Sequence, residues 1–114
     1  MSRISVDMLA SILKYMDIEY MTDEECDSIY DLDINDGEDQ EAVIERVIIP
    51  GLVREYEKNE FKEFREIILL GLNKVKERNI EFKSRSFPFK NELQDQEAFL
   101  RKIYNKLLEE EKED

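Results

Sequence analysis

The chain has 114 residues, of which 41% are hydrophobic and 40% are charged, and its formal net charge is −12. This length fits one domain with a modest core, and the apolar content is too high for a disordered chain. Because histidine is absent and there is a single cysteine, a Ser–His–Asp site, a Cys–His site and an internal disulfide are excluded. We therefore expect a soluble protein of a reducing cytoplasm that is not an enzyme, needs no cofactor and has no apolar run long enough to span a membrane.

The first predicted helix covers residues 5–16, with Ser5 as its N-cap. Its apolar side chains recur at spacings of three and four residues, which places them on one face. They are Ile4, Met8, Leu9, Ile12, Leu13 and Met16. A second, short helix is predicted after Thr22, because Thr22 and Glu25 have the capping-box spacing and acidic residues fill the first turn.

The middle of the chain reads as a loop followed by a kinked helix. Residues 31–40 (DLDINDGEDQ) are rich in turn-forming Asp, Asn and Gly, so we expect a loop there. The apolar positions of residues 41–58 fit a helical stripe, although the β-branched run within them also suits a strand. We favour a helix over 40–49, a kink at Pro50 and a second helix that ends at residue 58.

The most apolar segment, residues 60–78, is predicted to be a helix at the centre of the core, capped by Asn59 and closed by Asn79. Leu72 lies near the middle of that expected core. The apolar residues of the segment form a broad stripe that consists of Phe61, Phe64, Ile67, Ile68, Leu69, Leu70, Leu72 and Val75.

The last third of the chain is predicted to be an extended connection, with one short strand near 80–89, followed by a helix over 92–110. That helix would start at a capping-box-like pair, Asn91 and Gln94. Glu97 and Arg101 stand four residues apart in the order that stabilises a helix. The inward-facing residues of this helix are expected to be Ala98, Phe99, Leu100, Ile103, Tyr104, Leu107 and Leu108.

Together these elements predict an all-α fold, a small bundle of about five helices joined by short links. We expect residues 1–108 to form one helical domain and residues 109–114 to be a frayed acidic tail. No internal repeat or low-complexity linker divides the chain.

The charge is distributed unevenly along the chain. Residues 15–45 hold 13 acidic and no basic residues, whereas the remainder has 16 acidic and 17 basic residues. Concentrating charge in this way costs self-repulsion, but it steers a positively charged partner toward one face. Two tyrosines accompany the acids, and tyrosine is a frequent interface anchor. The predicted partner-binding residues are Asp17, Glu19, Tyr20, Asp23, Glu24, Asp27, Tyr30, Asp31, Asp33, Asp36, Glu38 and Asp39.

Two other interpretations of the acidic segment remain. Residues 74–90 have a net charge of +4, so the acidic segment could pair with them within one chain or across a homodimer. A charge run can also serve solubility alone.

Residues 31–42 begin like an EF-hand calcium loop, with Asp31, Asp33 and Asn35 at the first three ligand positions. The sixth position needs glycine but holds Asp36, and the twelfth needs glutamate but holds Ala42. The sequence therefore predicts no specific metal site, and it leaves open a loose attraction of divalent cations.

Two further features are interpreted as structural. Cys26 lies between Glu25 and Asp27, and negative neighbours raise the pKa of a thiol, so we expect no nucleophilic role. The aromatic residues Phe82, Phe87 and Phe89 lie among basic residues, which can indicate a nucleic-acid surface. The net charge of −12 opposes phosphate binding, so we assign these rings to the core and expect no direct nucleic-acid partner.

Our leading hypothesis is a non-enzymatic acidic protein that neutralises a basic partner protein, such as an immunity protein or antitoxin that inhibits a nuclease-like toxin. A small acidic helical chain suits this role, because an inhibitor of a basic nuclease cleft must imitate phosphate charge. The alternatives are a nucleic-acid mimic that blocks a DNA-binding protein, and a small acidic secretion or assembly chaperone.

Overall fold

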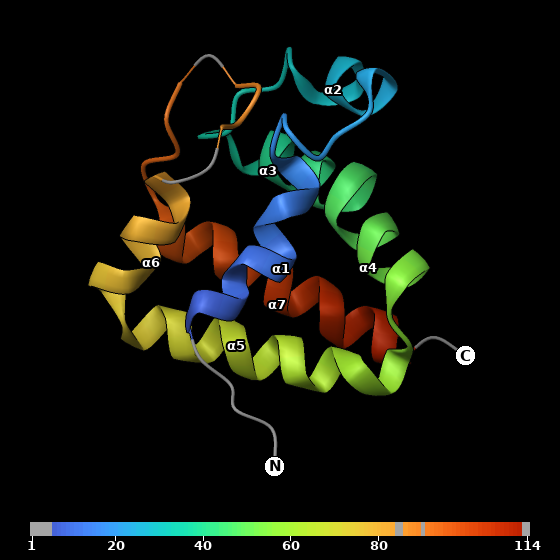
Figure 1. Ribbon diagram of the computed structural model, residues 1–114, viewed down its shortest axis with the longest axis vertical. Helices are drawn as coiled ribbons and strands as arrows, with labels where there is room; N and C mark the ends of the chain where they lie inside the picture. Colours follow the sequence, from blue (N-terminus) through green and yellow to red (C-terminus); the bar gives the residue numbers. More distant parts are fainter. Residues whose placement is uncertain (1–5, 84–85, 90, 113–114) are drawn as a thin grey trace.

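The computed structural model describes residues 6–83, 86–89 and 91–112. Within these residues the chain forms six helical segments, joined by loops, and no strand (Figure 1). The predicted all-α bundle is confirmed, with six segments in place of about five. In chain order the elements are 3₁₀-helix η1 Val6–Leu9, α1 Ala10–Leu13, 3₁₀-helix η2 Lys14–Met16, α2 Asp23–Ile29, α3 Gly37–Val43, π-helical turn η3 Ile44–Ile48, α4 Ile49–Glu55, 3₁₀-helix η4 Lys58–Glu60, α5 Phe61–Asn73, α6 Val75–Lys83 and α7 Gln96–Lys112.

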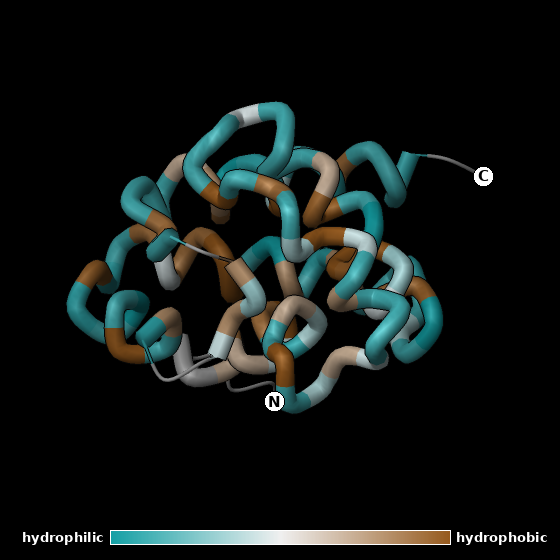
Figure 2. The backbone as a smooth tube through the Cα atoms, turned by 90° about the horizontal axis from the view of Figure 1, so that it is seen from above, coloured by the Kyte–Doolittle hydropathy of each residue, from teal (hydrophilic) through white to brown (hydrophobic). Residues whose placement is uncertain are grey.

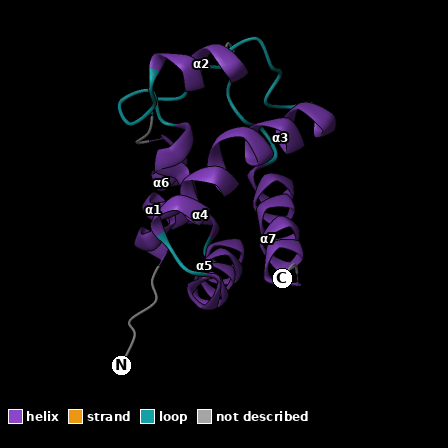
Figure 3. Cartoon of the chain, turned by 90° about the vertical axis from the view of Figure 1, so that its right-hand side faces the viewer, coloured by secondary structure: helices purple, strands orange, loops and turns teal. Residues whose placement is uncertain are grey.

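Helices α5 and α7 run side by side along one edge of the molecule, and α1 crosses over them (Figures 1 and 3). Their facing residues are fully or almost fully buried: Phe61, Phe64, Ile67 and Ile68 from α5, and Phe99, Leu100, Ile103 and Leu107 from α7. Near the end of α7, both carboxylate oxygens of Glu111 accept hydrogen bonds from Arg65 of α5. Arg65 Nε donates to Oε2, and Nη2 donates to Oε1 at 3.0 Å. The α5–α7 pair thus forms the base of the core. No described helix is long and apolar enough to cross a membrane.

The predicted helix over 60–78 is confirmed for Phe61–Asn73, but the chain leaves the helical conformation at Lys74 (φ −113°, ψ 73°). Helix α6 follows at once and continues to Lys83, where an extended segment with a short strand was expected. Val75 and Ile80 are 50% and 57% exposed, and α6 lacks a continuous apolar face. Its burial is confined to Phe82 and Arg78, and its contacts with η1 and α5 hold it in place. Asn79 accordingly lies within a helix rather than at its end.

Residues 37–55 stay helical throughout, so the chain continues as a helix through Pro50, where a kink was expected. The π-helical turn η3 ends two residues before Pro50, and Pro50 occupies the first turn of α4. Proline lacks the N–H that an α-helix interior needs, and a π-helical turn shifts the hydrogen-bonding register, so the two features fit together. The strand alternative for this stretch is excluded, since Val43, Ile44, Val47, Ile48 and Leu52 are buried on one helical face.

Several predicted helix ends move by a few residues. Helix α3 begins at Gly37 rather than at residue 40, because the Asp36 side chain caps it. Helix α7 begins at Gln96, with Asp95 accepting from the Ala98 N–H at 3.0 Å, and not at the Asn91 pair. It includes residues 109–112 of the predicted tail.

The first predicted helix is confirmed over residues 6–16, where Leu9, Ile12, Leu13 and Met16 are buried. Ile4, Ser5 and residues 113–114 lie outside the described residues, as do the side chains of Val6 and Asp7.

Gly51 explains how α4 approaches the first helical segment so closely. It is buried, and a Cβ atom added to it would overlap the Tyr15 ring, whose Cγ would be only 2.8 Å away. Tyr15 is itself buried. The absence of a side chain at Gly51 therefore allows the Tyr15 ring to pack closely against α4, one turn before Glu55.

Candidate functional site

The acidic segment occupies one end of the molecule, where α2, the turn after it and the start of α3 lie farthest from α5 (Figures 1 and 3). Seen from that end, the nearest stretches of backbone are largely hydrophilic (Figure 2). The predicted partner-binding residues of this segment differ in what their side chains do.

Helix α2 begins at the predicted capping box. Thr22 Oγ1 accepts from the Glu25 N–H at 3.2 Å, and the Glu25 carboxylate accepts from the Thr22 N–H at 3.0 Å. Asp23 and Glu24 then fall in the first turn, where the helix dipole favours negative charge. They are exposed, as is Asp27 one turn later.

Four of the predicted partner-binding carboxylates serve the backbone instead. Asp36 caps α3 by accepting from the Asp39 N–H at 3.0 Å, and Asp39 accepts from the Asp33 N–H at 2.8 Å. Asp33 accepts from the Asn35 N–H at 2.9 Å, and the buried Asp17 accepts from the Glu19 N–H at 2.9 Å. The turn that resembles a calcium loop is therefore built from aspartates that satisfy main-chain donors.

The predicted acidic residues that are exposed and accept no hydrogen bond from a backbone N–H group of the described residues are fewer. They are Glu19, Asp23, Glu24, Asp27, Asp31 and Glu38, which we call the exposed acidic face. Tyr30 lies among them and is 47% exposed.

Tyr20 belongs to a different group, which sequence reasoning missed. Its hydroxyl donates to Glu55 Oε1, while the Tyr15 hydroxyl donates to Glu55 Oε2 at 2.6 Å. Lys14 Nζ lies 3.1 Å from the same Oε2 and about 5 Å from the centre of each tyrosine ring, at 5.1 Å and 5.0 Å. The two rings meet edge to face with their centroids 5.6 Å apart. Only Tyr20 carried a sequence signal, and nothing local pointed to Glu55.

The pKa values in this group follow from its geometry. Hydrogen bonds from Tyr15, Tyr20 and Lys14 lower the pKa of Glu55 from 4.5 to about 2. Burial and the hydrogen bond to Glu55 raise the pKa of Tyr15, and the same carboxylate raises the pKa of Tyr20. Burial alone would lower the pKa of Lys14, but the Glu55 carboxylate outweighs it and the net shift is upward. The group therefore stays in a single protonation state, tyrosines neutral and Glu55 ionised, over the ordinary pH range, which suits a structural clamp better than proton transfer.

The acidic segment also forms ion pairs with the rest of the chain. Glu25 lies 3.8 Å from Arg54 of α4, and Glu45 lies 2.6 Å from Lys106 of α7. These partners lie outside residues 74–90, the basic stretch that the sequence offered as an internal counterpart. The two stretches nevertheless touch through the backbone, since the Ile18 N–H donates to the Ser86 carbonyl at 2.7 Å.

Asn35 joins the acidic turn to the chain just before α7. Its side-chain amide donates to the Glu92 carbonyl at 3.0 Å, and its side-chain oxygen accepts from the Gln94 N–H at 2.8 Å. This residue was a candidate metal ligand in the sequence, and the structure gives it the role of a bridge.

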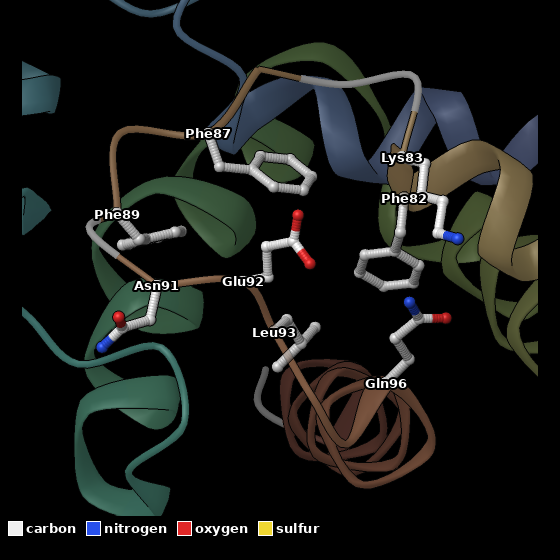
Figure 4. A pocket seen from close by; sticks show the side chains of 8 residues that line it. All are labelled: Phe82, Lys83, Phe87, Phe89, Asn91, Glu92, Leu93 and Gln96. Atoms are coloured by element: carbon white, nitrogen blue, oxygen red, sulfur yellow. The ribbon is translucent and has the colours of Figure 1, made fainter.

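A cavity of about 580 Å³ lies on the far side of that bridge, between the end of α6 and the start of α7 (Figure 4). Its apolar walls are Phe82, Phe87, Phe89 and Leu93. Phe82 is buried as predicted, whereas Phe87 and Phe89 are only partly buried against the core. Glu92, Gln96 and Lys83 add polar groups to the lining.

Neither Cys26 nor a metal cluster adds a reactive centre to this end. Cys26 is half-buried, with its sulfur 4.0 Å from that of Met21. Burial first, then Asp23, Asp27 and Glu25, raises the thiol pKa, which confirms the predicted direction. No group of three or more Cys, Asp or Glu side chains within the described ranges is arranged to hold a metal ion.

No protein-family model, curated protein or solved structure matches this chain.

Proposed function

We propose that this chain is a non-enzymatic cytoplasmic binding protein whose exposed acidic face neutralises a basic surface on another protein. The observation that supports it is that some carboxylates of the segment bind backbone N–H groups, whereas others do not. Asp17, Asp33, Asp36 and Asp39 serve the backbone, while the residues of the exposed acidic face are left to the solvent around a half-exposed Tyr30. Exposed carboxylates and a half-exposed tyrosine within one segment suit a basic protein surface.

The kind of partner follows from the charge. A nuclease-like toxin has a basic cleft that normally holds phosphates, and carboxylates on a small rigid helix can occupy it. An immunity protein or antitoxin therefore fits best. A nucleic-acid mimic is a weaker candidate, because the net negative charge lies in residues 15–45, while the remainder of the chain has 16 acidic and 17 basic residues.

The first experiment is affinity capture of the partner from host lysate at low salt, followed by release with salt and identification by mass. We expect one basic protein in near-stoichiometric yield, and a loss of its nuclease activity on addition of the chain. Several DNA-binding proteins captured together would point to mimicry instead. A chain that captures nothing and runs as a salt-sensitive dimer would overturn the proposal.

The second experiment uses the structure to choose the variants. Asp27→Lys with Asp31→Lys reverses two exposed charges and leaves the backbone-binding aspartates intact, and we expect it to weaken partner binding at least tenfold. The control, Glu63→Lys with Glu66→Lys, makes the same charge change on the exposed side of α5. Equal affinity losses in both double variants would show that only the net charge matters and that the acidic face is not the interface.

A further inference from the structure

Helix α6 buries very little of its own surface. Of its nine residues only Arg78 and Phe82 are buried, while Val75 and Ile80 are 50% and 57% exposed. A helix in a globular protein is stabilised mainly by the apolar face that it buries. Phe82 is the only buried apolar side chain among residues 75–83, so its contact with Phe99 of α7, with ring centroids 6.4 Å apart, is a main apolar attachment of this helix.

The other buried side chain of α6 is a cation. Arg78 is 6% exposed, and its Nε and Nη1 atoms are buried without a hydrogen-bond partner among the described residues. Burial of an unpaired charge costs desolvation free energy. A buried lysine or glutamate can reduce that cost by changing its protonation, but a guanidinium stays charged. Return of the Arg78 side chain to water removes the cost, so its burial favours an open position of α6.

A single non-helical residue separates α6 from α5. Lys74 has φ −113° and ψ 73°, between the last residue of α5 and the first residue of α6. Hinges are typically a few residues at the ends of elements that absorb a change in φ and ψ. Rotation at Lys74 moves α6 without disturbing α5, whose buried residues lie between Phe61 and Gly71. Helix α6 also lies at the edge of the molecule, on the opposite side from α4 (Figure 1).

We propose that α6 is a displaceable strap, which opens as one unit about Lys74 while the rest of the core stays folded. In the open state Arg78 is hydrated near the exposed Lys74 and Lys76, and the sides of η1 and α5 that contact α6 lose their cover. Elements with few buried apolar contacts commonly open in this way, at a smaller free energy than global unfolding. The closed fold thus hides a guanidinium and an aromatic ring that the open fold presents. The inference does not depend on the exposed acidic face.

The direct test is native-state hydrogen exchange of the full chain, followed by NMR at several urea concentrations below the unfolding transition. We expect the amides of residues 79–83 to exchange about 100-fold faster than the buried amides of α5 and α7, after correction for intrinsic rates. Their exchange should rise together with urea, because a shared opening exposes surface. Exchange of α6 at the rate of α5 and α7 would overturn the proposal. Unequal rates within α6 that do not respond to urea would also overturn it, since they indicate fraying.

Arg78→Met tests the cost of the buried charge. Methionine and arginine have similar helix propensities, so the substitution acts mainly through burial. We expect the amides of residues 79–83 to exchange about tenfold more slowly in this variant. The control, Arg101→Met, removes the same charge from a position on α7 that is 63% exposed, and it should leave exchange in α6 unchanged. Unchanged or faster exchange in Arg78→Met, or equal slowing in both variants, would overturn the proposal.

Ile49→Val separates local opening from global unfolding. Ile49 is buried in α4, on the side of the molecule opposite α6 (Figure 1). Loss of one buried methyl group lowers global stability, so the slowest amides of α5 and α7 should exchange several-fold faster. Exchange in α6 should not change, because α4 stays folded in the open state. Equal acceleration of both sets of amides would show that α6 opens only when the whole molecule unfolds. This comparison holds whether or not Arg78→Met folds.

Discussion

The Tyr15 hydroxyl donates a 2.6 Å hydrogen bond to Glu55, a residue 40 positions later in the chain. This contact ties the end of the first helical segment to the end of α4. It depends on Gly51, which lets the Tyr15 ring lie against the helix one turn earlier. Tyr20 adds a second donor from the start of the acidic segment, so the orientation of that segment is coupled to the core.

Removal of the Tyr15 hydroxyl should destabilise the fold. For Tyr15→Phe we expect the free energy of unfolding to fall by about 1–3 kcal/mol, because a buried ring loses a hydrogen bond to a charged acceptor. Urea denaturation measures the change. Tyr30→Phe is the control, since Tyr30 is half-exposed, and its effect should stay within about 0.5 kcal/mol. Equal effects of the two variants would mean that the Glu55 group contributes little.

Stability should depend on pH through the same group. The folded-state pKa of Glu55 is lowered from 4.5 to about 2, so its contribution is fully present above pH 4.5 and is lost as the pH falls toward 2. The raised pKa of Tyr15 has the opposite sign, and its contribution is present below pH 10 and lost as the pH rises above it.

The measurement is the free energy of unfolding of the wild type and of Glu55→Gln between pH 2 and pH 7. We expect a difference at pH 7 that disappears near pH 2. Glu63→Gln, at an exposed position on α5, should follow the wild type at every pH. A difference between wild type and Glu55→Gln that persists at pH 2 would show that it comes from packing rather than from the carboxylate charge.

Two of the three helical glycines, Gly51 and Gly37, should respond differently to substitution. Gly51→Ala should lower the free energy of unfolding by about 1–3 kcal/mol, because the new methyl group overlaps the Tyr15 ring. Gly37→Ala is the matched control. Its methyl group would meet nothing nearer than Lys102 Nζ at 4.0 Å, and alanine favours the helix, so we expect no loss or a gain of up to about 1 kcal/mol. A stable Gly51→Ala protein would mean that Tyr15 can move aside without cost.

Core truncations should rank the positions of α5. Ile68 is fully buried, so Ile68→Ala should cost about 2–5 kcal/mol. Leu72, the position that the sequence placed near the core centre, is only partly buried, and Leu72→Ala should cost clearly less. Thermal or urea unfolding of both variants decides the order, and a larger loss at Leu72 would contradict the packing of α5 described above.

Arg78 is a buried cation whose Nε and Nη1 have no hydrogen-bond partner within the described part of the chain. Replacing it with methionine keeps an unbranched apolar stem and removes the unsatisfied donors. We therefore expect Arg78→Met to raise the free energy of unfolding by about 1–3 kcal/mol. Arg101→Met, at an exposed position on α7, should change it by no more than about 0.5 kcal/mol. A loss of stability in Arg78→Met would show that the guanidinium has an acceptor in solution.

Features that depend on neighbours within one or two helical turns could be predicted from the amino-acid order. The all-α class followed from the three- and four-residue spacing of apolar side chains, which Leu9, Ile12 and Leu13 obey with complete burial. The Thr22 capping box and the Glu97–Arg101 pair, at 2.9 Å, formed as expected because both partners belong to the same helix. These interactions are local, so spacing alone specifies them.

The remaining features depend on contacts between residues far apart in the chain, and only the three-dimensional structure shows them. Helix α6 has no apolar stripe of its own and exists through its contacts with η1 and α5, so the sequence suggested an extended segment instead. The acidic residues look alike in the sequence, and only folding distinguishes those that accept hydrogen bonds from backbone N–H groups, such as Asp33, from exposed ones without such a bond in the described part of the chain, such as Asp27. Glu55 accepts hydrogen bonds from two tyrosines because folding brings together residues some forty positions apart in the chain. Gln96 lines an aromatic cavity because folding places the start of α7 beside the end of α6. Long-range packing sets these roles, and no local pattern encodes it.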